Sequence, residues 1–170
     1  MDDGDAQYPI GTFGLYNACG ERASTRRSPF ANRDWLMQLA NYLFFTTTCE
    51  QALAFYTRCG LGRVTEMVRY GTVMPAPTAA MQGKVMHSRF EGPGVLFYAS
   101  DNHDAEPMRG SAHMLMMDGR EATDQLFAQL AEGGTITTPL GIQPWGDYYG
   151  KLTDQFGVQW MLNCPVRSGS

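Results

Sequence analysis

The sequence predicts an α+β fold built from two β-α-β-β-β modules that share one core, with the helices outside and the concave sheet faces forming a cleft. The same order of strand and helix patterns occurs twice, and the predicted helix starts at Thr48 and Asp118 lie 70 residues apart. The hairpin predicted over residues 145–164 is so rich in aromatic side chains that it needs a broad apolar surface to cover it. Neither module could cover both faces of its own sheet, so the two are expected to pack together.

The first module is expected over about residues 40–100. It opens with an apolar, β-prone run, and Thr48 and Gln51 then have the spacing of a capping box, in which side chains satisfy free N–H groups at a helix start. Apolar residues at helical spacing follow, and Gly60 ends the helix. A Pro-rich loop and a Gly-Pro-Gly turn separate the later strands. The strands are expected at residues 41–47, 63–70, 84–91 and 95–100.

The second module, expected over about residues 110–165, repeats this order. Asp118 begins another sequence with capping-box spacing, and the glycine pair at residues 133–134 ends the second helix. Asp154 and Gly157 predict the tight turn of the final hairpin, because an aspartate accepts local hydrogen bonds and a glycine adopts positive φ easily. The strands are expected at residues 111–117, 135–140, 147–153 and 158–164.

Length and composition favour one globular domain, placed at residues 37–166. The chain has 170 residues, of which 44% are hydrophobic and 18% are charged, as in ordinary globular proteins. Residues 1–36 mix Gly, Pro, Asn, Ser and Arg without a sustained period. This segment is interpreted either as a weakly structured extension or as one that docks through its aromatic residues. Residues 167–170 are interpreted as a flexible tail.

Charge and hydropathy argue against several functional classes. The net charge is −4 and no cluster of Lys and Arg occurs, so a nucleic-acid partner is not expected. No apolar run is long enough to span a bilayer, so no membrane partner is expected either. The acidic start is broken by Pro9 and does not match a secretory signal, which favours the cytoplasm. The cysteines contain no metal-type pair and are expected to be free thiols: Cys19, Cys49, Cys59 and Cys164.

Several segments carry a resemblance to a known family. They are CEQALAFYTRCGLGRVTEMVRYG, KVMHSRFEGPGVLFYASD, LFAQLAEGGTITTPL and WGDYYGKLTDQFGVQWMLNC, in this order between residues 38 and 165. Together they resemble the PhnB-like branch of the vicinal oxygen chelate superfamily, which includes glyoxalases, bleomycin-resistance proteins and dioxygenases. The resemblance implies paired βαβββ modules, a curved mixed sheet around a cleft and a homodimer. It does not imply one activity, because lyases, isomerases, dioxygenases and drug-binding proteins share this scaffold.

The resemblance also identifies four positions where catalytic members of the superfamily hold a divalent metal, one on each of four cleft-lining strands. Aligned on the helix and turn landmarks, these positions fall on Asn41, Phe97, His113 and Met161. Phe offers no donor atom and the Met thioether suits soft ions, so one histidine would have to hold a hard or borderline metal ion. The usual metal site is therefore expected to be lost, and no cofactor is predicted.

Side-chain alternation along the strands predicts the contents of the cleft. Its wall is expected to be mainly apolar, with a few amides and one imidazole. The opposite faces are expected to pack beneath the helices, and they include Tyr42, Phe44, Leu96, Met114, Met116, Trp160 and Leu162. The candidate ligand-binding residues are Asn41, Leu43, Phe45, His87, Phe97, His113, Leu115, Trp145, Tyr149 and Met161.

Some of these candidates have a second interpretation. His87 and His113 could form a metal pair, although a hydrogen-bonded structural role is favoured for each. Trp145 and Tyr149 lie at the entry to the final hairpin, where they either cap a ligand or hold strand register through aromatic pairing. The cleft itself could instead be filled by its own side chains, residues 1–36 included.

Two functions follow from these patterns. The favoured function is metal-free binding of a small, partly apolar organic molecule in the cleft between the modules, by a homodimer. The alternative is a glyoxalase-like lyase, isomerase or dioxygenase. It would use a rearranged metal site, or acid/base chemistry by His113 with a nearby carboxylate such as Asp147.

Overall fold

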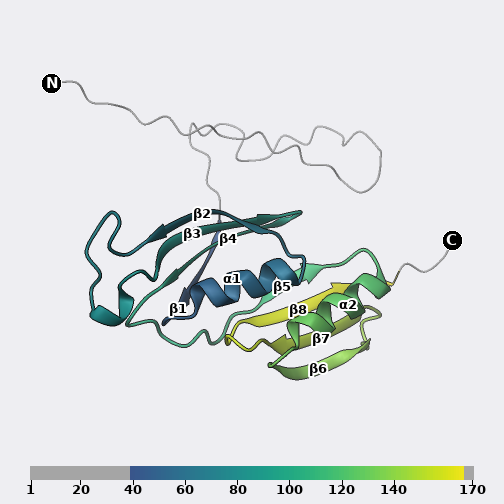
Figure 1. Ribbon diagram of the computed structural model, residues 1–170. Helices are drawn as coiled ribbons and strands as arrows, with labels where there is room; N and C mark the ends of the chain where they lie inside the picture. The colour runs from purple at the N-terminus through teal and green to yellow at the C-terminus, as the bar shows by residue number, and fades with distance from the viewer. Residues whose placement is uncertain (1–38, 167–170) are drawn as a thin grey trace, which may run out of the picture. The chain divides into compact units, whose positions relative to one another are not determined.

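A computed structural model describes residues 39–166, and these residues contain the two expected modules (Figure 1). The first module consists of β1 (Asn41–Phe45), α1 (Cys49–Arg58), β2 (Arg63–Arg69), β3 (Val85–Gly92) and β4 (Val95–Asp101). A short 3-10 helix, η1 (Ala79–Met81), lies between β2 and β3. The second module consists of β5 (His113–Met116), α2 (Arg120–Leu130), β6 (Thr135–Ile142), β7 (Tyr148–Thr153) and β8 (Gln159–Cys164). The predicted α+β class and element order are confirmed.

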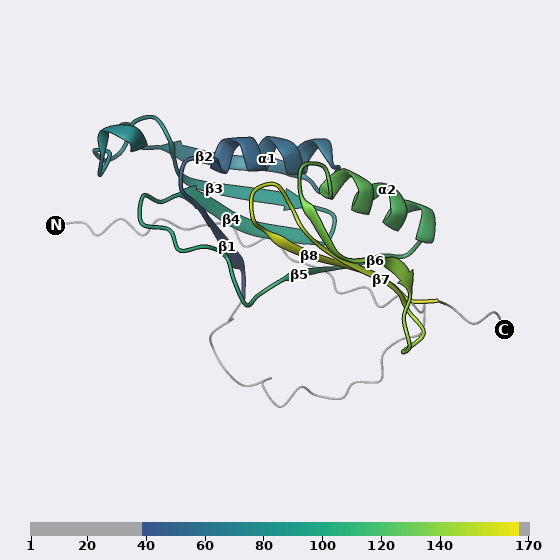
Figure 2. The ribbon, with the colours of Figure 1, turned by 90° about the horizontal axis from the view of Figure 1, so that it is seen from below.

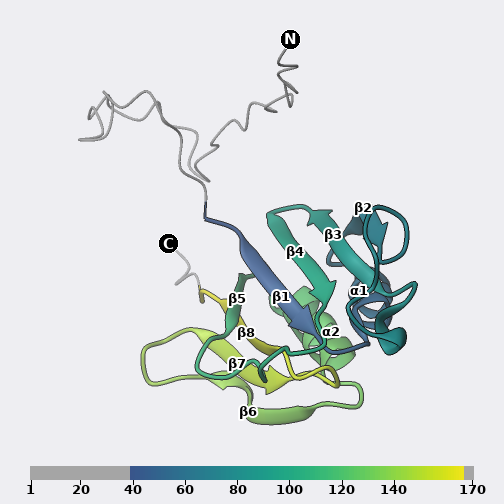
Figure 3. The same ribbon diagram turned by 90° about the vertical axis from the view of Figure 1, so that its left-hand side faces the viewer.

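Each module forms one four-stranded mixed sheet. The strand orders are β1-β4-β3-β2 and β5-β8-β7-β6, so β1 and β5 occupy equivalent edges. The first strand of each module runs parallel to the last strand, and the other pairs are antiparallel. Figure 2 shows α1 and α2 on the same side of the strands, and Figure 3 shows β1 lying toward β5. We call the strand faces toward the helices the helix side and the opposite faces the open side.

One hydrophobic core joins the two modules, as the sequence predicts. Tyr56 of α1 is fully buried, and its ring lies 6.0 Å from the ring of Phe97 in β4 and 5.5 Å from that of Trp160 in β8. Phe127 and Leu130 of α2 belong to the same cluster. Burying a large apolar side chain contributes roughly 1.5–3 kcal/mol to folding, so these contacts fasten the second module to the first.

The final hairpin turns at the predicted place. Oδ1 of Asp154 accepts hydrogen bonds from the backbone N–H groups of Phe156 and Val158, at 2.8 and 3.0 Å, and Gly157 has φ of 86°. Oδ2 of the same carboxylate accepts from the Tyr56 hydroxyl at 2.8 Å and from the Trp160 indole at 2.9 Å. Burial, followed by the charge of Asp154, raises the pKa of Tyr56, so its hydroxyl stays protonated and donates.

The predicted capping boxes form in neither module, although Thr48 is at the N-cap of α1 as predicted. Thr48 precedes α1 but its side chain makes no capping hydrogen bond; Asp101, at the end of β4, accepts from the N–H of Cys49 at 2.9 Å instead. The residue before α2 is Gly119 rather than Asp118. A capping box involves only residues that are close in sequence. At the start of α1, a buried carboxylate from a distant strand accepts from a free N–H group instead.

The predicted strand faces are partly wrong. Register places Asn41 beside Phe97, and His113 beside Trp160, on the helix side, whereas Met161 pairs with Met114 on the open side. Successive side chains of a strand point to opposite faces. An error of one residue in counting to a strand therefore assigns all of its side chains to the wrong face. Trp160 and Leu162 are buried as expected. Tyr42, Phe44, Met114 and Met116 are 40, 44, 49 and 63% exposed, and Leu96 is partly exposed, although these residues were expected beneath the helices.

Other expectations concern the chain as a whole. Cys49, Cys59 and Cys164 are free and buried, and Cys19 lies outside the described residues, as do the extension before residue 37 and the tail at 167–170. Among residues 39–166, the helices are too short and too polar to cross a membrane.

Candidate functional site

The structure brings five of the predicted cleft residues together where the modules meet. The Asn41 amide at the start of β1 lies 3.2 Å from Nδ1 of His113 at the start of β5. This pair lines a cavity of about 180 Å³ together with apolar side chains of both modules. The lining includes Asn41, Leu43, Phe97, His113, Leu115 and, from outside the predicted set, Trp160. The register of β1 and β5 with their parallel neighbours thus delivers an amide and an imidazole to one place.

The environment of His113 favours a neutral ring. Burial lowers the pKa of His113, and the more distant charge of Asp154 opposes this effect. A neutral ring accepts the Asn41 amide N–H on Nδ1 and carries its proton on Nε2. In this state the basic nitrogen of His113 is already engaged by Asn41.

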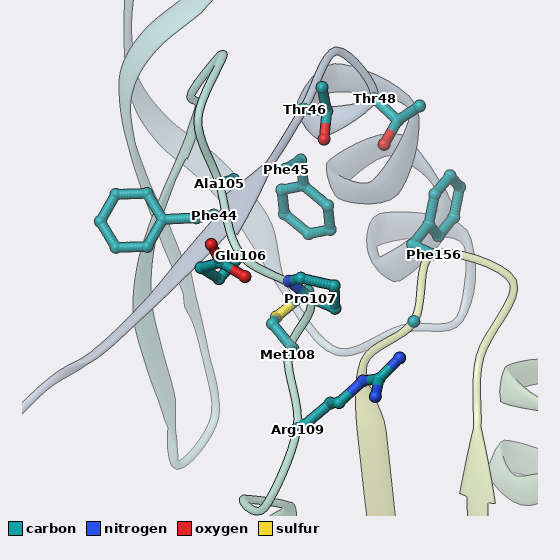
Figure 4. Close-up of a pocket in the computed structure, with 11 residues that line it drawn as sticks. Phe44, Phe45, Thr46, Thr48, Ala105, Glu106, Pro107, Met108, Arg109 and Phe156 are labelled. Atoms are coloured by element: carbon teal, nitrogen blue, oxygen red, sulfur yellow. The ribbon is translucent and has the colours of Figure 1, made fainter.

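A larger cavity, of about 470 Å³, lies at the other end of β1 (Figure 4). Phe45 and Phe156 form part of its wall, with ring centroids 6.5 Å apart, and Met108 from the segment between the modules adds a thioether. Threonine hydroxyls and the charged side chains of Glu106 and Arg109 also line the cavity. Its lining is Phe44, Phe45, Thr46, Thr48, Ala105, Glu106, Pro107, Met108, Arg109, Phe156 and Gly157.

Sequence reasoning found only Phe45 in this larger cavity. Arg109 and Met108 belong to the connection between modules, and Phe156 lies in the hairpin turn, so none of them follows the strand alternation used to select candidates. Their position in the chain was the one signal that could have identified them. If the two modules share one core, the first module, the connection and the last turn must lie close together. Loops held by a rigid scaffold commonly carry binding residues.

His87, Tyr149 and Met161 lie on the open side, and Trp145 lies in the loop between β6 and β7. Nδ1 of His87 on β3 lies 3.1 Å from the Tyr42 hydroxyl, and the His87 ring is stacked 5.5 Å from that of Tyr98. Trp145 is 62% exposed and meets Tyr149 edge to face at 5.6 Å. His87 and His113 thus lie on opposite faces of their sheets, so the alternative metal pair is not formed.

Comparison with known proteins identifies the family of the chain. The sequence model of the glyoxalase/bleomycin resistance protein/dioxygenase superfamily matches residues 38–162. The chain belongs to this superfamily.

Relatives resemble this chain in both sequence and fold. Protein YjdN of Escherichia coli is 25% identical over 139 residues, which are 75% of this chain and 95% of YjdN. The crystal structure of protein PA1353 from Pseudomonas aeruginosa is similar with a TM-score of 0.69 and 35% identity, covering 76% of this chain and 98% of PA1353. The PhnB protein from Bacillus cereus has a TM-score of 0.65 and 26% identity, covering 75% of this chain and 99% of PhnB.

The residues at the predicted metal positions of this superfamily member do not fit a divalent metal. Asn41 and His113 provide one amide and one imidazole, but Phe97 offers no donor, and Met161 lies on the opposite side of its sheet from His113. Within residues 39–166, no three His, Cys, Asp or Glu side chains are grouped so that they could hold a metal ion. A divalent ion in this fold would need several oxygen and nitrogen donors that converge.

The acid/base alternative also lacks its expected partner. Asp147 accepts a hydrogen bond from the Asn163 amide at 2.9 Å, so it is engaged in the final hairpin rather than with His113. Asp154 influences the pKa of His113 only through space, and its two oxygens already accept four hydrogen bonds. A general base must reach the proton that it removes, which neither carboxylate does through His113.

Proposed function

We propose that this superfamily member binds a small, partly apolar organic molecule without a metal, in the cavity between its modules. The observation that carries the proposal is the cavity of about 470 Å³ formed by β1, the connection between modules and the β7–β8 turn. Its volume lies within the range of roughly 300–1,000 Å³ typical of small-molecule sites. The smaller cavity of about 180 Å³ beside Asn41 and His113 would admit only a compact group.

The chemistry of the lining supports the same conclusion. Phe45 and Phe156 provide an apolar wall, which favours transfer of an apolar ligand from water. Thr48 is adjacent, and because its side chain does not cap α1, its hydroxyl is available to a ligand. A wall that combines aromatic rings with a few polar side chains can both bury and orient a small, partly apolar molecule.

Thermal-shift screening against small aromatic and aliphatic compounds tests this function. We expect ligands that raise the melting temperature, and we expect Phe156→Leu to weaken those ligands because it removes a ring from the wall while keeping the site apolar. Val73→Leu is the matched control, since Val73 is 66% exposed and lies outside the lining. The function is contradicted if no compound stabilises the protein, or if all hits bind Phe156→Leu as tightly as the wild type.

We further propose that the protein is a cytoplasmic homodimer. The open side carries exposed apolar residues from both sheets, including Phe44 of β1 and Met116 of β5, and exposed apolar surface of this kind commonly marks an interface. The free, buried thiols Cys49, Cys59 and Cys164 fit a reducing compartment.

A further inference from the structure

The larger cavity contains two formal charges of opposite sign, contributed by the segment between the modules. Glu106 and Arg109 both line it and both are exposed. In Figure 4 the Glu106 carboxylate lies on the Phe44 side of this segment, whereas the Arg109 guanidinium extends toward Phe156. The wall near Phe156 is thus the positive part of the site.

The Arg109 guanidinium has no acidic partner in the part of the chain that the structure describes. The two ion pairs between residues 39 and 166 join Arg69 to Glu50 and Arg89 to Glu91, and neither includes Arg109. A guanidinium presents several N–H donors in one plane, which suits two parallel hydrogen bonds to a carboxylate. Charge complementarity therefore favours a ligand with an anionic group at this end.

The aromatic wall specifies the remainder of the ligand. Phe156 is held in place by Phe45, Phe55 and Tyr56, with ring centroids 6.5, 5.7 and 6.3 Å away. Such a fixed set of rings favours a planar apolar body, because aromatic rings gain energy from offset or edge-to-face contacts beyond the area that they bury. Met108 can adapt to the outline of that body, since its side chain is unbranched and flexible.

We infer that the ligand is an aromatic carboxylate whose ring packs against Phe156 and Met108 and whose carboxylate pairs with Arg109. The inference rests on the proposed function and specifies its ligand class. Glu106 acts as a charge filter, because it repels an anion that enters in the reverse orientation or carries a second negative group. Salt should weaken the preference for a carboxylate ligand, since Arg109 is exposed and its charge is screened.

Calorimetric titration with 1-naphthylacetate and its neutral amide, 1-naphthylacetamide, tests the inference on the full chain. The two probes share a ring system and differ in charge. We expect the wild-type protein to bind the carboxylate about tenfold more tightly than the amide at low salt, as for a charge-assisted pair. Arg109→Gln should abolish this difference between the two probes, because glutamine has no positive charge with which the carboxylate can pair.

Glu106→Gln is the matched opposite change. It should raise the ratio of carboxylate affinity to amide affinity about twofold, since it removes a like charge from the same segment. Equal affinities of the wild-type protein for both probes, or a preference that persists in Arg109→Gln, would overturn the inference and leave the proposed function standing. If neither probe binds, the inference fails, and the compound screen decides separately whether the proposed function fails with it.

Discussion

Asp154 is a single buried carboxylate that connects the last hairpin to the first helix. It is 4% exposed and accepts four hydrogen bonds, two from the turn backbone and one each from Tyr56 and Trp160. Asp154→Asn would turn an amide N–H₂ toward donors, and the Trp160 indole cannot accept in return. We expect the free energy of unfolding to fall by about 3 kcal/mol.

Urea unfolding followed by tryptophan fluorescence measures this loss. Asp104→Asn is the control, because Asp104 is exposed and removing its charge should change the stability by less than about 0.5 kcal/mol. A loss for Asp154→Asn no larger than that of the control would show that the four hydrogen bonds do not hold the turn.

His113 makes the stability depend on pH. Because burial lowers its folded-state pKa below the ordinary value of 6.5, the unfolded chain takes up this proton first as the pH falls. The contribution is therefore fully present above pH 6.5 and is lost between that value and the lower folded-state pKa. His113→Gln should flatten this part of the profile of unfolding free energy against pH.

The matched control for His113 is His103→Gln, because His103 is exposed in the described structure. For His103→Gln, the unfolding free energy should still decline below pH 6.5 as it does in the wild-type protein. An unchanged profile for His113→Gln would mean that the ring is as readily protonated in the folded protein as in the unfolded chain.

The residue scale also shows how far the site could be predicted. Asn41 and His113 were selected by counting from helix and turn landmarks, and their side chains lie in contact in the structure. The same counting failed for Met161, since the alternation of a strand turns an error of one residue into the opposite face. Arg109 and Phe156 could not be found in this way, because loop residues follow no period and their place depends on how the modules pack.

At the scale of elements, both modules use a glycine at the same structural point. Gly62 follows α1 and Gly134 follows α2, and a Cβ added there would lie 2.2 Å from the carbonyl oxygen of Glu91 in β3 or 2.4 Å from that of Thr153 in β7. Each helix exit thus packs directly on a strand of its own hairpin. The repeated strand and helix order was visible in the sequence, whereas this contact was not, since it joins segments far apart in the chain.

Gly134→Ala tests the close approach in the second module. The added Cβ meets backbone atoms, which cannot move as a side chain would, so we expect the free energy of unfolding to fall by about 2 kcal/mol. Gly141→Ala is the control, because nothing lies within 4 Å of its added Cβ. Chemical denaturation of the two variants side by side measures the difference, and equal stabilities would contradict the contact.

The helix starts mark the limit of local prediction at this scale. The elements themselves follow from periodicity and turn residues, because these patterns act over a few neighbours. The caps do not, since Asp101 reaches Cys49 from a strand more than fifty residues away in sequence. A local motif loses to a tertiary contact when the latter already places a buried acceptor at the helix start.

At the scale of the whole molecule, the open sides of the sheets require an explanation. Met114 and Met116 lie on β5, at an edge of its sheet, and are 49 and 63% exposed. Phe44 and Tyr42 lie on β1, the equivalent edge of the other sheet, and are 44 and 40% exposed. Within residues 39–166, both edges therefore combine strand backbone that pairs with no further strand and apolar side chains, a combination that favours association unless it is covered.

We expect the full chain to sediment as a dimer, and the double substitution Met114→Lys with Met116→Lys to shift it toward the monomer. A stable interface commonly buries about 1,600 Å² in total, and two charges in its apolar part would lack partners. Val73→Lys is the control, because Val73 is 66% exposed in a loop between β2 and β3, away from both edges. Sedimentation velocity at matched concentrations separates the outcomes. A monomeric wild-type protein would exclude the homodimer, whereas a dimer that survives the double substitution would place its interface away from β5.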